Sequence, residues 1–205
     1  AAATLAEFEV GVDDSLSRFI RRLPLGVVFV VAPWNYPYLT AINTIAPALI
    51  AGNAVVLKHA TQTLLAGDRL ATAFHSAGVP EQLFVNICLD HETTAALIAD
   101  GLFDFINFTG SVGGGRAIER AAAGTFTGVG TELGGKDPGY VMDDADLDAA
   151  VATLVDAAMF NSGQCCCGIE RIYVHDSLYD DFVARSVATV NDYRLGNPLD
   201  SDTTM

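Results

Sequence analysis

Apolar runs alternate with amphipathic stretches along most of this 205-residue chain. Short runs rich in valine, without polar alternation, are typical of strands buried on both faces, as in parallel sheets. The run over residues 26–32 is of this kind, and further strands are predicted over residues 54–58, 83–88, 103–108, 127–133 and 139–142. The spacing of apolar residues between them predicts helices over residues 39–51, 63–77, 92–100 and 116–123. Strands and helices that alternate with short connections indicate a doubly wound, mainly parallel sheet of the Rossmann-like type.

The last third of the chain repeats the alternation, with a helix over 147–160, a strand over 171–175 and a helix over 177–190. An acidic, turn-like segment over 143–148 precedes it, and acidic residues favour a helix N-terminus. We therefore expect an α/β protein in three parts. These are a connecting segment (1–23), a nucleotide-binding domain (24–146) and the start of a second α/β domain (147–205).

One uncharged stretch, residues 23–57, exceeds the roughly 20 apolar residues that a membrane-spanning helix needs. Prolines at positions 24, 33, 37 and 47 interrupt it repeatedly. We interpret it as strand, turn, helix, turn and strand in a buried core, and we expect no membrane association.

Charge and cysteine usage narrow the function classes. The net charge of −14 disfavours nucleic acid and anionic membranes as partners, because both need a basic face. The first nine residues lack the basic n-region of a secretory signal. An exposed reactive thiol suits a reducing compartment, so we expect a cytoplasmic protein.

Three of the four cysteines are adjacent, at Cys165, Cys166 and Cys167. Adjacent side chains diverge, so only one of the three can face a given cleft. Metal-ligand spacing is absent, and only Cys88 remains as a disulfide partner. Two interpretations stay open on chemistry alone: one nucleophilic thiol with two neighbours acting as small buried hydrophobes, or three inert buried cysteines.

The surrounding motifs resemble those of the aldehyde dehydrogenase superfamily, in that family's order. They are Pro33-Trp34-Asn35-Tyr36-Pro37, Leu57-Lys58, Phe108-Thr109-Gly110-Ser111, Glu132-Leu133-Gly134-Gly135-Lys136 and Gly163-Gln164-Cys165-Cys166-Cys167. The resemblance implies an NAD(P)-dependent, non-acylating dehydrogenase, with the second α/β domain as the start of its catalytic domain.

The resemblance also implies catalytic roles. Cys166 would attack an aldehyde carbonyl and form a thiohemiacetal, then a thioester. Asn35 would donate to the oxyanion, although an asparagine between two prolines also suits a turn. Glu132 would activate the water that hydrolyses the thioester, which favours a carboxylic acid as product. Glutamate is otherwise an ordinary surface residue.

The cofactor would be NAD or NADP. The turn from Gly110 through Ser111 to Gly115 lies between a strand and a helix, where backbone N–H groups suit a pyrophosphate, though as a bare pattern it is weak. By resemblance, Ser111 would contact phosphate and Lys58 the adenosine ribose. The cofactor-binding set that the resemblance implies also contains Trp34, Thr61 and Leu133.

Two positions depart from the family pattern. His59 stands where proline is common, and Thr61 where many NAD-preferring members have glutamate, so NADP is admissible. The Lys-His-Ala form is similar to that of bacterial semialdehyde dehydrogenases of the succinate type. The remaining histidines, His75, His91 and His175, have no metal-ligand spacing and are expected to be structural or surface residues.

Family members are considerably longer than this chain. We therefore expect a partial chain of a protein that binds a small aldehyde and forms a homo-oligomer at full length. The alternative is a catalytically inactive nucleotide-binding fragment, possibly of semialdehyde type.

Overall fold

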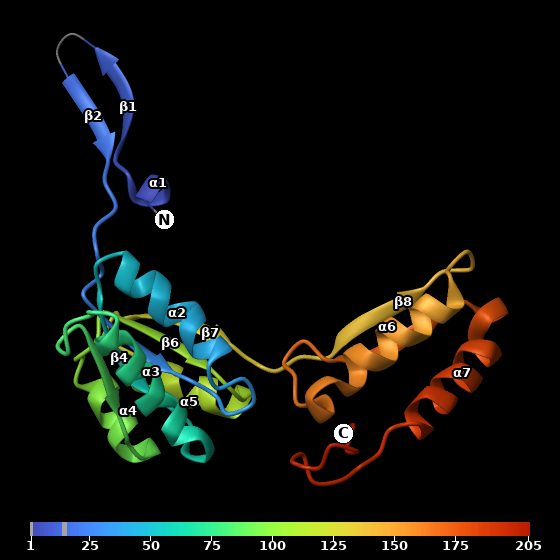
Figure 1. The fold of residues 1–205 in the computed structure, drawn as a ribbon. Coiled ribbons are helices and arrows are strands. Elements are labelled where there is room, and N and C mark those ends of the chain that lie inside the picture. The colour runs from blue at the N-terminus through green and yellow to red at the C-terminus, as the bar shows by residue number, and fades with distance from the viewer. Residues whose placement is uncertain (1, 14–15) are drawn as a thin grey trace. The chain divides into compact units, whose positions relative to one another are not determined.

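The computed structural model describes residues 2–13 and 16–205 (Figure 1). The chain separates into two compact units, Ala1–Leu133 and Gly134–Met205. The expected division of the chain at residue 147 into a cofactor domain and a catalytic domain stays a prediction.

A parallel five-stranded sheet forms the centre of the first unit, with the strand order β5-β4-β3-β6-β7. Its strands are β3 (Val27–Val31), β4 (Ala54–Lys58), β5 (Phe84–Ile87), β6 (Phe105–Thr109) and β7 (Gly128–Glu132). All four neighbouring pairs are parallel. The predicted doubly wound, mainly parallel α/β fold is confirmed.

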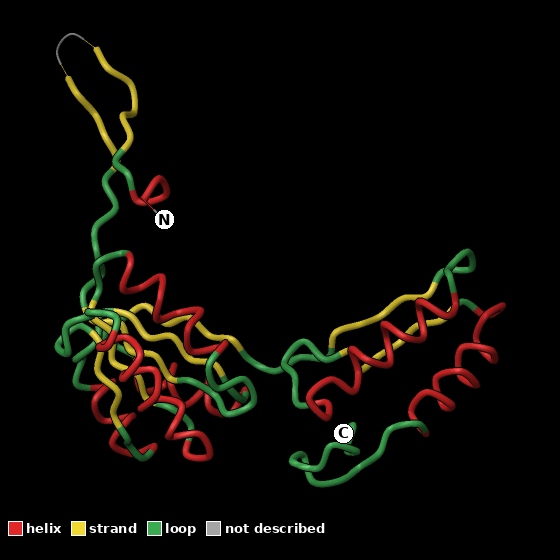
Figure 2. The backbone as a smooth tube through the Cα atoms, in the orientation of Figure 1, coloured by secondary structure: helices red, strands yellow, loops and turns green. Residues whose placement is uncertain are grey.

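Helices cover both faces of this sheet, which explains the continuous apolar strands (Figures 1 and 2). The helices are α2 (Leu39–Ile50), α3 (Leu64–Ser76), α4 (His91–Ala99) and α5 (Val112–Ala122). In β3, Val28 and Val30 pack against α2 and α3, while Phe29 and Val31 pack in the cluster of α4 and α5. Alternate side chains of one strand therefore serve two separate apolar cores.

The N-terminal segment contains elements that the sequence analysis did not predict. A short helix, α1 (Ala2–Leu5), precedes an antiparallel hairpin of β1 (Phe8–Asp13) and β2 (Leu16–Ile20). Every residue of β2 is exposed. Residues 1, 14 and 15 of the expected connecting segment lie outside the described residues.

The second unit contains two parallel strands, β8 (Asp137–Val141) and β9 (Ile169–Val174), and two helices, α6 (Leu147–Met159) and α7 (Tyr179–Asn191). Its core combines Val141, Val151, Val155 and Phe182. The strand expected over 139–142 is part of β8, and it does not join the five-stranded sheet as the alternation had predicted. It pairs with β9 because β8, α6 and β9 form one βαβ unit that buries the apolar side of α6.

Across residues 2–13 and 16–205, no helix combines the length and apolar character needed to cross a membrane.

Candidate active site

The strand order creates a crevice for a ligand at the carboxyl ends of the strands of the five-stranded sheet, referred to below as the carboxyl edge. From β3 the chain moves outward to β4 and β5, then crosses back to β6 and continues to β7. Ligands of open α/β sheets bind at the carboxyl ends of the strands where the order reverses. Here the reversal lies between β3, which is followed by Trp34 and Asn35, and β6, which is followed by Gly110 and Ser111.

A cavity of about 460 Å³ lies at this edge, bordered by α4 and α5. Lys58 at the end of β4 and Ser111 before α5 both line it, so two predicted cofactor residues share one cavity. The rest of the wall is mostly apolar or small and is formed by Val31, Thr94, Ala95, Phe108, Ala117, Ile118 and Ala121, together with His91 and Gly114.

Lys58 is held in an environment that disfavours its charge. The side chain is 4% exposed, and burial lowers its pKa from the usual 10.5, while Cys88 and Asp90 act in the opposite direction. Within the described part of the chain, no carboxylate forms an ion pair with it. A buried ammonium that lines a cavity without an ion-pair partner is suited to donate hydrogen bonds to a polar ligand.

Ser111 caps α5, and its hydroxyl oxygen accepts a hydrogen bond from the Gly114 N–H at 3.1 Å. The helix therefore begins at Val112 rather than at the expected residue 116. The glycines, expected in a turn, form its first turn because the serine cap offsets their low helix propensity. The free N–H groups and positive end of α5 lie beside the cavity that Ser111 lines, an arrangement suited to an anionic ligand.

Close packing explains most of the glycines around this turn. A Cβ on Gly110 or Gly114 would lie 2.7 or 2.5 Å from Cζ of Phe108, and one on Gly115 would lie 2.8 Å from Leu133. A Cβ on Gly113 would have no neighbour closer than 3.9 Å. Gly113 thus leaves open space over the first turn of α5, where a ligand could approach the backbone.

Glu132 is the last residue of the edge strand β7, and its side chain is exposed. Its carbonyl oxygen accepts a hydrogen bond from the Gly110 N–H at 2.9 Å, which joins this strand end to the turn before α5. Leu133 follows and packs into the core of α4 and α5. Leu133 therefore supports the helix at Gly115.

The segment after β3 carries Trp34, which is 43% exposed, and the half-buried Asn35. Thr61 is exposed and begins a short 3₁₀ helix (Thr61–Thr63) after β4. All three residues belong to segments that leave carboxyl ends of central strands.

Cys166 belongs to the second unit, in an irregular segment between a 3₁₀ helix (Phe160–Gly163) and β9. Its side chain is exposed. Asn161 and Ser162 adopt positive φ angles of 52° and 56°, a conformation that costs free energy in residues other than glycine.

The two neighbours of Cys166 were expected to be buried, and for Cys167 this is wrong. Cys165 is half-buried and Cys167 is exposed, with their sulfur atoms 3.3 Å apart. The Cys165 thiol raises the pKa of Cys167 through this contact. Cys166 and Cys167 lie in a turn closed by the Gly168 N–H, which donates to the Cys165 carbonyl oxygen at 3.2 Å, and this turn brings the Cys165 and Cys167 sulfur atoms together. No group of three potential metal-binding side chains occurs in the part of the chain that is described.

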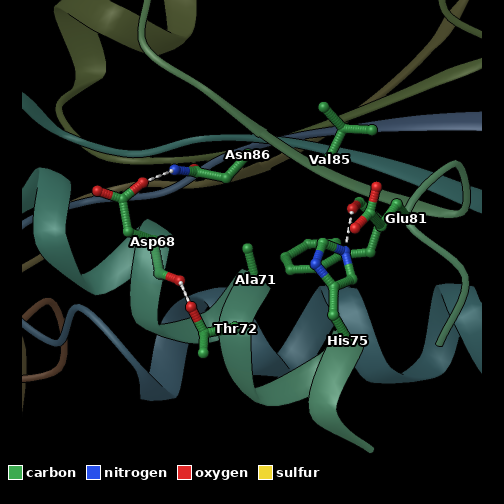
Figure 3. Close-up of a pocket in the computed structure, with 8 residues that line it drawn as sticks. Asp68, Ala71, Thr72, His75, Glu81, Val85 and Asn86 are labelled. Atoms are coloured by element: carbon green, nitrogen blue, oxygen red, sulfur yellow. Dashed lines mark hydrogen bonds between the residues drawn. The ribbon is translucent and has the colours of Figure 1, made fainter. Parts of the chain in front are cut away.

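The other histidines have identifiable contacts. His75 bonds the Phe84 carbonyl oxygen through Nε2 at 2.9 Å, in a second cavity of about 520 Å³ between α3 and the edge strand β5 (Figure 3). His175 accepts from the Ser177 N–H at a helix start. These two are structural, as expected. His91 is exposed and also lines the Lys58 cavity, a role that the sequence analysis missed.

A weak indication of this cavity wall is present in the sequence as small residues on two helices. Thr94 and Ala95 on α4, and Ala117 and Ala121 on α5, are small residues on two consecutive amphipathic helices. Small side chains at such positions leave space between neighbouring helices. Single-sequence reasoning did not reveal that α4 and α5 lie side by side.

The chain matches the aldehyde dehydrogenase family over residues 2–205. It is 39% identical to a Mycobacterium leprae protein named succinate-semialdehyde dehydrogenase [NADP(+)], over 95% of this chain and 42% of that protein. It is 41% identical to human mitochondrial aldehyde dehydrogenase, over 95% of this chain and 38% of that protein. A crystal structure of PnpE in complex with nicotinamide adenine dinucleotide is 32% identical and superposes with a TM-score of 0.93, over 98% of this chain and 42% of that one.

The chain thus spans about two fifths of the length of these relatives. The family match includes the parallel sheet, the turn before α5 and the segment of three cysteines. The chain belongs to the aldehyde dehydrogenase family.

Proposed function

We propose that the protein containing this chain oxidises an aldehyde to a carboxylic acid with NAD or NADP as hydride acceptor. The observation that carries the proposal is the cavity at the carboxyl edge of the sheet. It combines a buried lysine, a serine cap and a helix N-terminus in a chain of the aldehyde dehydrogenase family.

The residues at this cavity fit a dinucleotide. The first turn of α5 and the hydroxyl of Ser111 suit the pyrophosphate, because both offer hydrogen-bond donors beside an open space over Gly113. Lys58 would donate to ribose hydroxyls. Trp34, Thr61, Gly110, Gly115 and Leu133 complete the proposed binding set. When bound, the nicotinamide accepts a hydride from the substrate carbon.

The covalent chemistry is assigned to Cys166. Its thiolate adds to the aldehyde carbonyl, and the Asn35 side-chain amide donates a hydrogen bond to the resulting oxyanion. Loss of the hydride leaves a thioester on Cys166. Glu132 then removes a proton from a water molecule, which attacks the thioester and releases the carboxylic acid and the free thiol.

The catalytic residues that we propose come from both units of the chain. Asn35 and Glu132 belong to the first unit and Cys166 to the second.

Two observations favour a semialdehyde as the substrate and NADP as an acceptable cofactor. The name of the Mycobacterium leprae relative contains both succinate semialdehyde and NADP(+). In this chain the uncharged Thr61 lies just beyond Lys58, where it presents no negative charge to a 2′-phosphate. We propose succinate semialdehyde as the first substrate to test, with NAD and NADP compared directly.

The test is a rapid-mixing experiment on the intact protein with each cofactor and a panel of aldehydes that includes succinate semialdehyde and acetaldehyde. The proposal predicts a burst of reduced cofactor that is absent in Cys166→Ala and retained in Cys165→Ala. No reduced cofactor with any aldehyde, from protein that still binds NAD or NADP, would contradict the activity and favour a nucleotide-binding role alone.

A further inference from the structure

His59 is a buried polar residue with no place in the reaction described above. It follows Lys58 directly, at the end of β4, and is 1% exposed. A buried imidazole costs free energy unless its two ring nitrogens find hydrogen-bond partners. The partners of His59 therefore indicate what this side chain connects.

Both ring nitrogens are satisfied. The backbone N–H of Ala60 donates to Nδ1 at 3.0 Å, so Nδ1 is the acceptor of a neutral ring and the proton is assigned to Nε2. Nε2 then donates to the carbonyl oxygen of Pro37 at 2.8 Å. The Thr63 hydroxyl lies 2.9 Å from Nδ1 and can donate to it.

The hydrogen bond to Pro37 joins two separate segments. Pro37 lies two residues after Asn35, in the segment between β3 and α2, and is 22 residues away from His59 in the sequence. At the base of this segment, Ala32 donates its N–H to the Lys58 carbonyl oxygen at 3.1 Å. His59 adds a second attachment farther along the segment, close to Asn35.

We propose that His59 is a positioning residue that fixes the segment of Asn35 against the strand end that carries Lys58. The inference rests on the proposed function, in which Asn35 stabilises the oxyanion and Lys58 binds the cofactor. A fixed segment keeps the Asn35 amide at a constant position relative to the bound cofactor. A displacement of about 1 Å in such a group can lower a rate by about 10²-fold.

Two substitutions separate the roles of the two ring nitrogens. The carbonyl oxygen of Asn in His59→Asn can replace Nδ1 as acceptor for Ala60, but the side chain is too short to reach Pro37. The amide of Gln in His59→Gln places a donor near the position of Nε2 and can reach the Pro37 carbonyl. The proposal predicts that His59→Gln behaves like the unmodified protein and that His59→Asn does not.

The first readout is amide hydrogen exchange of peptides covering residues 33–42 in the intact protein without ligands. We expect exchange in His59→Asn to be faster by about tenfold, which corresponds to the loss of one hydrogen bond, and exchange in His59→Gln to be unchanged. Far-UV circular dichroism and thermal melting check that both variants fold. Equal exchange in the two variants would overturn the proposal.

The second readout is the burst rate of reduced cofactor together with the cofactor Kd. We expect His59→Asn to lower the burst rate by about tenfold to 10²-fold, with little change in Kd, and His59→Gln to restore it. Equal burst rates in the two variants would refute the positioning role. An unmodified protein without a burst would instead refute the proposed function, while the exchange contrast would still test the attachment of the segment.

Discussion

Lys58 carries a positive charge in a place that disfavours it. The side chain is almost fully buried, its pKa is lowered chiefly by burial, and it lines the cavity assigned to the cofactor. A protein interior rarely retains such a lysine for stability, because an apolar side chain of the same length would be tolerated better. The burial of Lys58 therefore supports its proposed role in binding the cofactor.

The substitution Lys58→Met tests whether this lysine binds the cofactor. The variant should bind NAD or NADP more weakly by about 10- to 100-fold, because a hydrogen bond to a charged group contributes about 1.5–3 kcal/mol. Its free energy of unfolding at neutral pH should equal or exceed that of the unmodified protein. Isothermal titration and chemical denaturation measure the two effects. Unchanged affinity would exclude Lys58 from the cofactor site.

The same variant tests the lowered pKa of Lys58. The folded protein releases this proton at a lower pH than the unfolded chain, whose lysine titrates near 10.5. Between the two pKa values the unfolded chain binds more protons, so the free energy of unfolding rises with pH. The free energy of unfolding, measured by chemical denaturation at pH 8 and pH 10, should therefore contain a contribution from Lys58 that increases with pH. This contribution should be missing in Lys58→Met. Parallel pH dependence in both proteins would contradict the effect of burial.

The sequence indicated which residues belong to the proposed cofactor site better than it indicated the exposure and hydrogen bonds of individual side chains. Lys58 and Ser111 were expected at the cofactor site, and the structure gives them one shared cavity. The exposure of Cys167 and the hydrogen bonds of His59 were not predictable. Both depend on contacts between backbone segments whose relative positions follow only from the folded chain.

Among the elements, α5 combines helix formation with the proposed phosphate site. Its first turn contains three consecutive glycines, two of which pack closely against other residues, while Gly113 has open space beside it. The glycines therefore have different roles, which substitution by alanine can separate.

Gly113→Ala should stabilise the protein by up to about 1 kcal/mol, because alanine favours a helix over glycine. Gly114→Ala should destabilise it by about 1–3 kcal/mol, because the new methyl group would overlap the Phe108 ring, 2.5 Å from Cζ. Urea denaturation of the two variants measures the difference. Similar stabilities would contradict the packing described for this turn.

Ser111 should have two separable roles in the same element. Ser111→Ala removes the cap and should cost about 1 kcal/mol of stability. Ser111→Asp keeps a capping acceptor but adds a negative charge beside the proposed pyrophosphate. We expect the aspartate variant to retain stability and to bind cofactor more weakly than the alanine variant, as measured by titration. Equal affinity in the two variants would place the pyrophosphate elsewhere.

At this scale, hydrophobic periodicity predicted every strand of the five-stranded sheet and each flanking helix, because these elements are buried on the faces that the pattern marks. It failed for the start of α5, where a serine cap overrides glycine, and for β8, whose partner is set by a later βαβ unit. In the hairpin of β1 and β2, all of β2 and residues 8–10 of β1 are exposed, so these strands have no buried apolar face that a sequence pattern could indicate.

For the whole molecule, the catalytic residues that we propose are distributed over both units of the chain. The first unit contains the proposed cofactor residues together with Asn35 and Glu132, and the second contains Cys166. Each unit has its own apolar core. The chemistry that we propose requires the Cys166 thiol and the Glu132 carboxylate to act on the same substrate carbon.

The most direct test is the mass of the Cys166 peptide after the intact Glu132→Gln protein is mixed with cofactor and succinate semialdehyde. Glutamine cannot remove a proton from water, so the thioester should accumulate on Cys166 and increase the peptide mass by that of the acyl group. The unmodified protein should hydrolyse the adduct and turn over. Absence of an adduct, or an adduct on Cys165 or Cys167 instead, would contradict the assignment of Cys166 and Glu132 to one site.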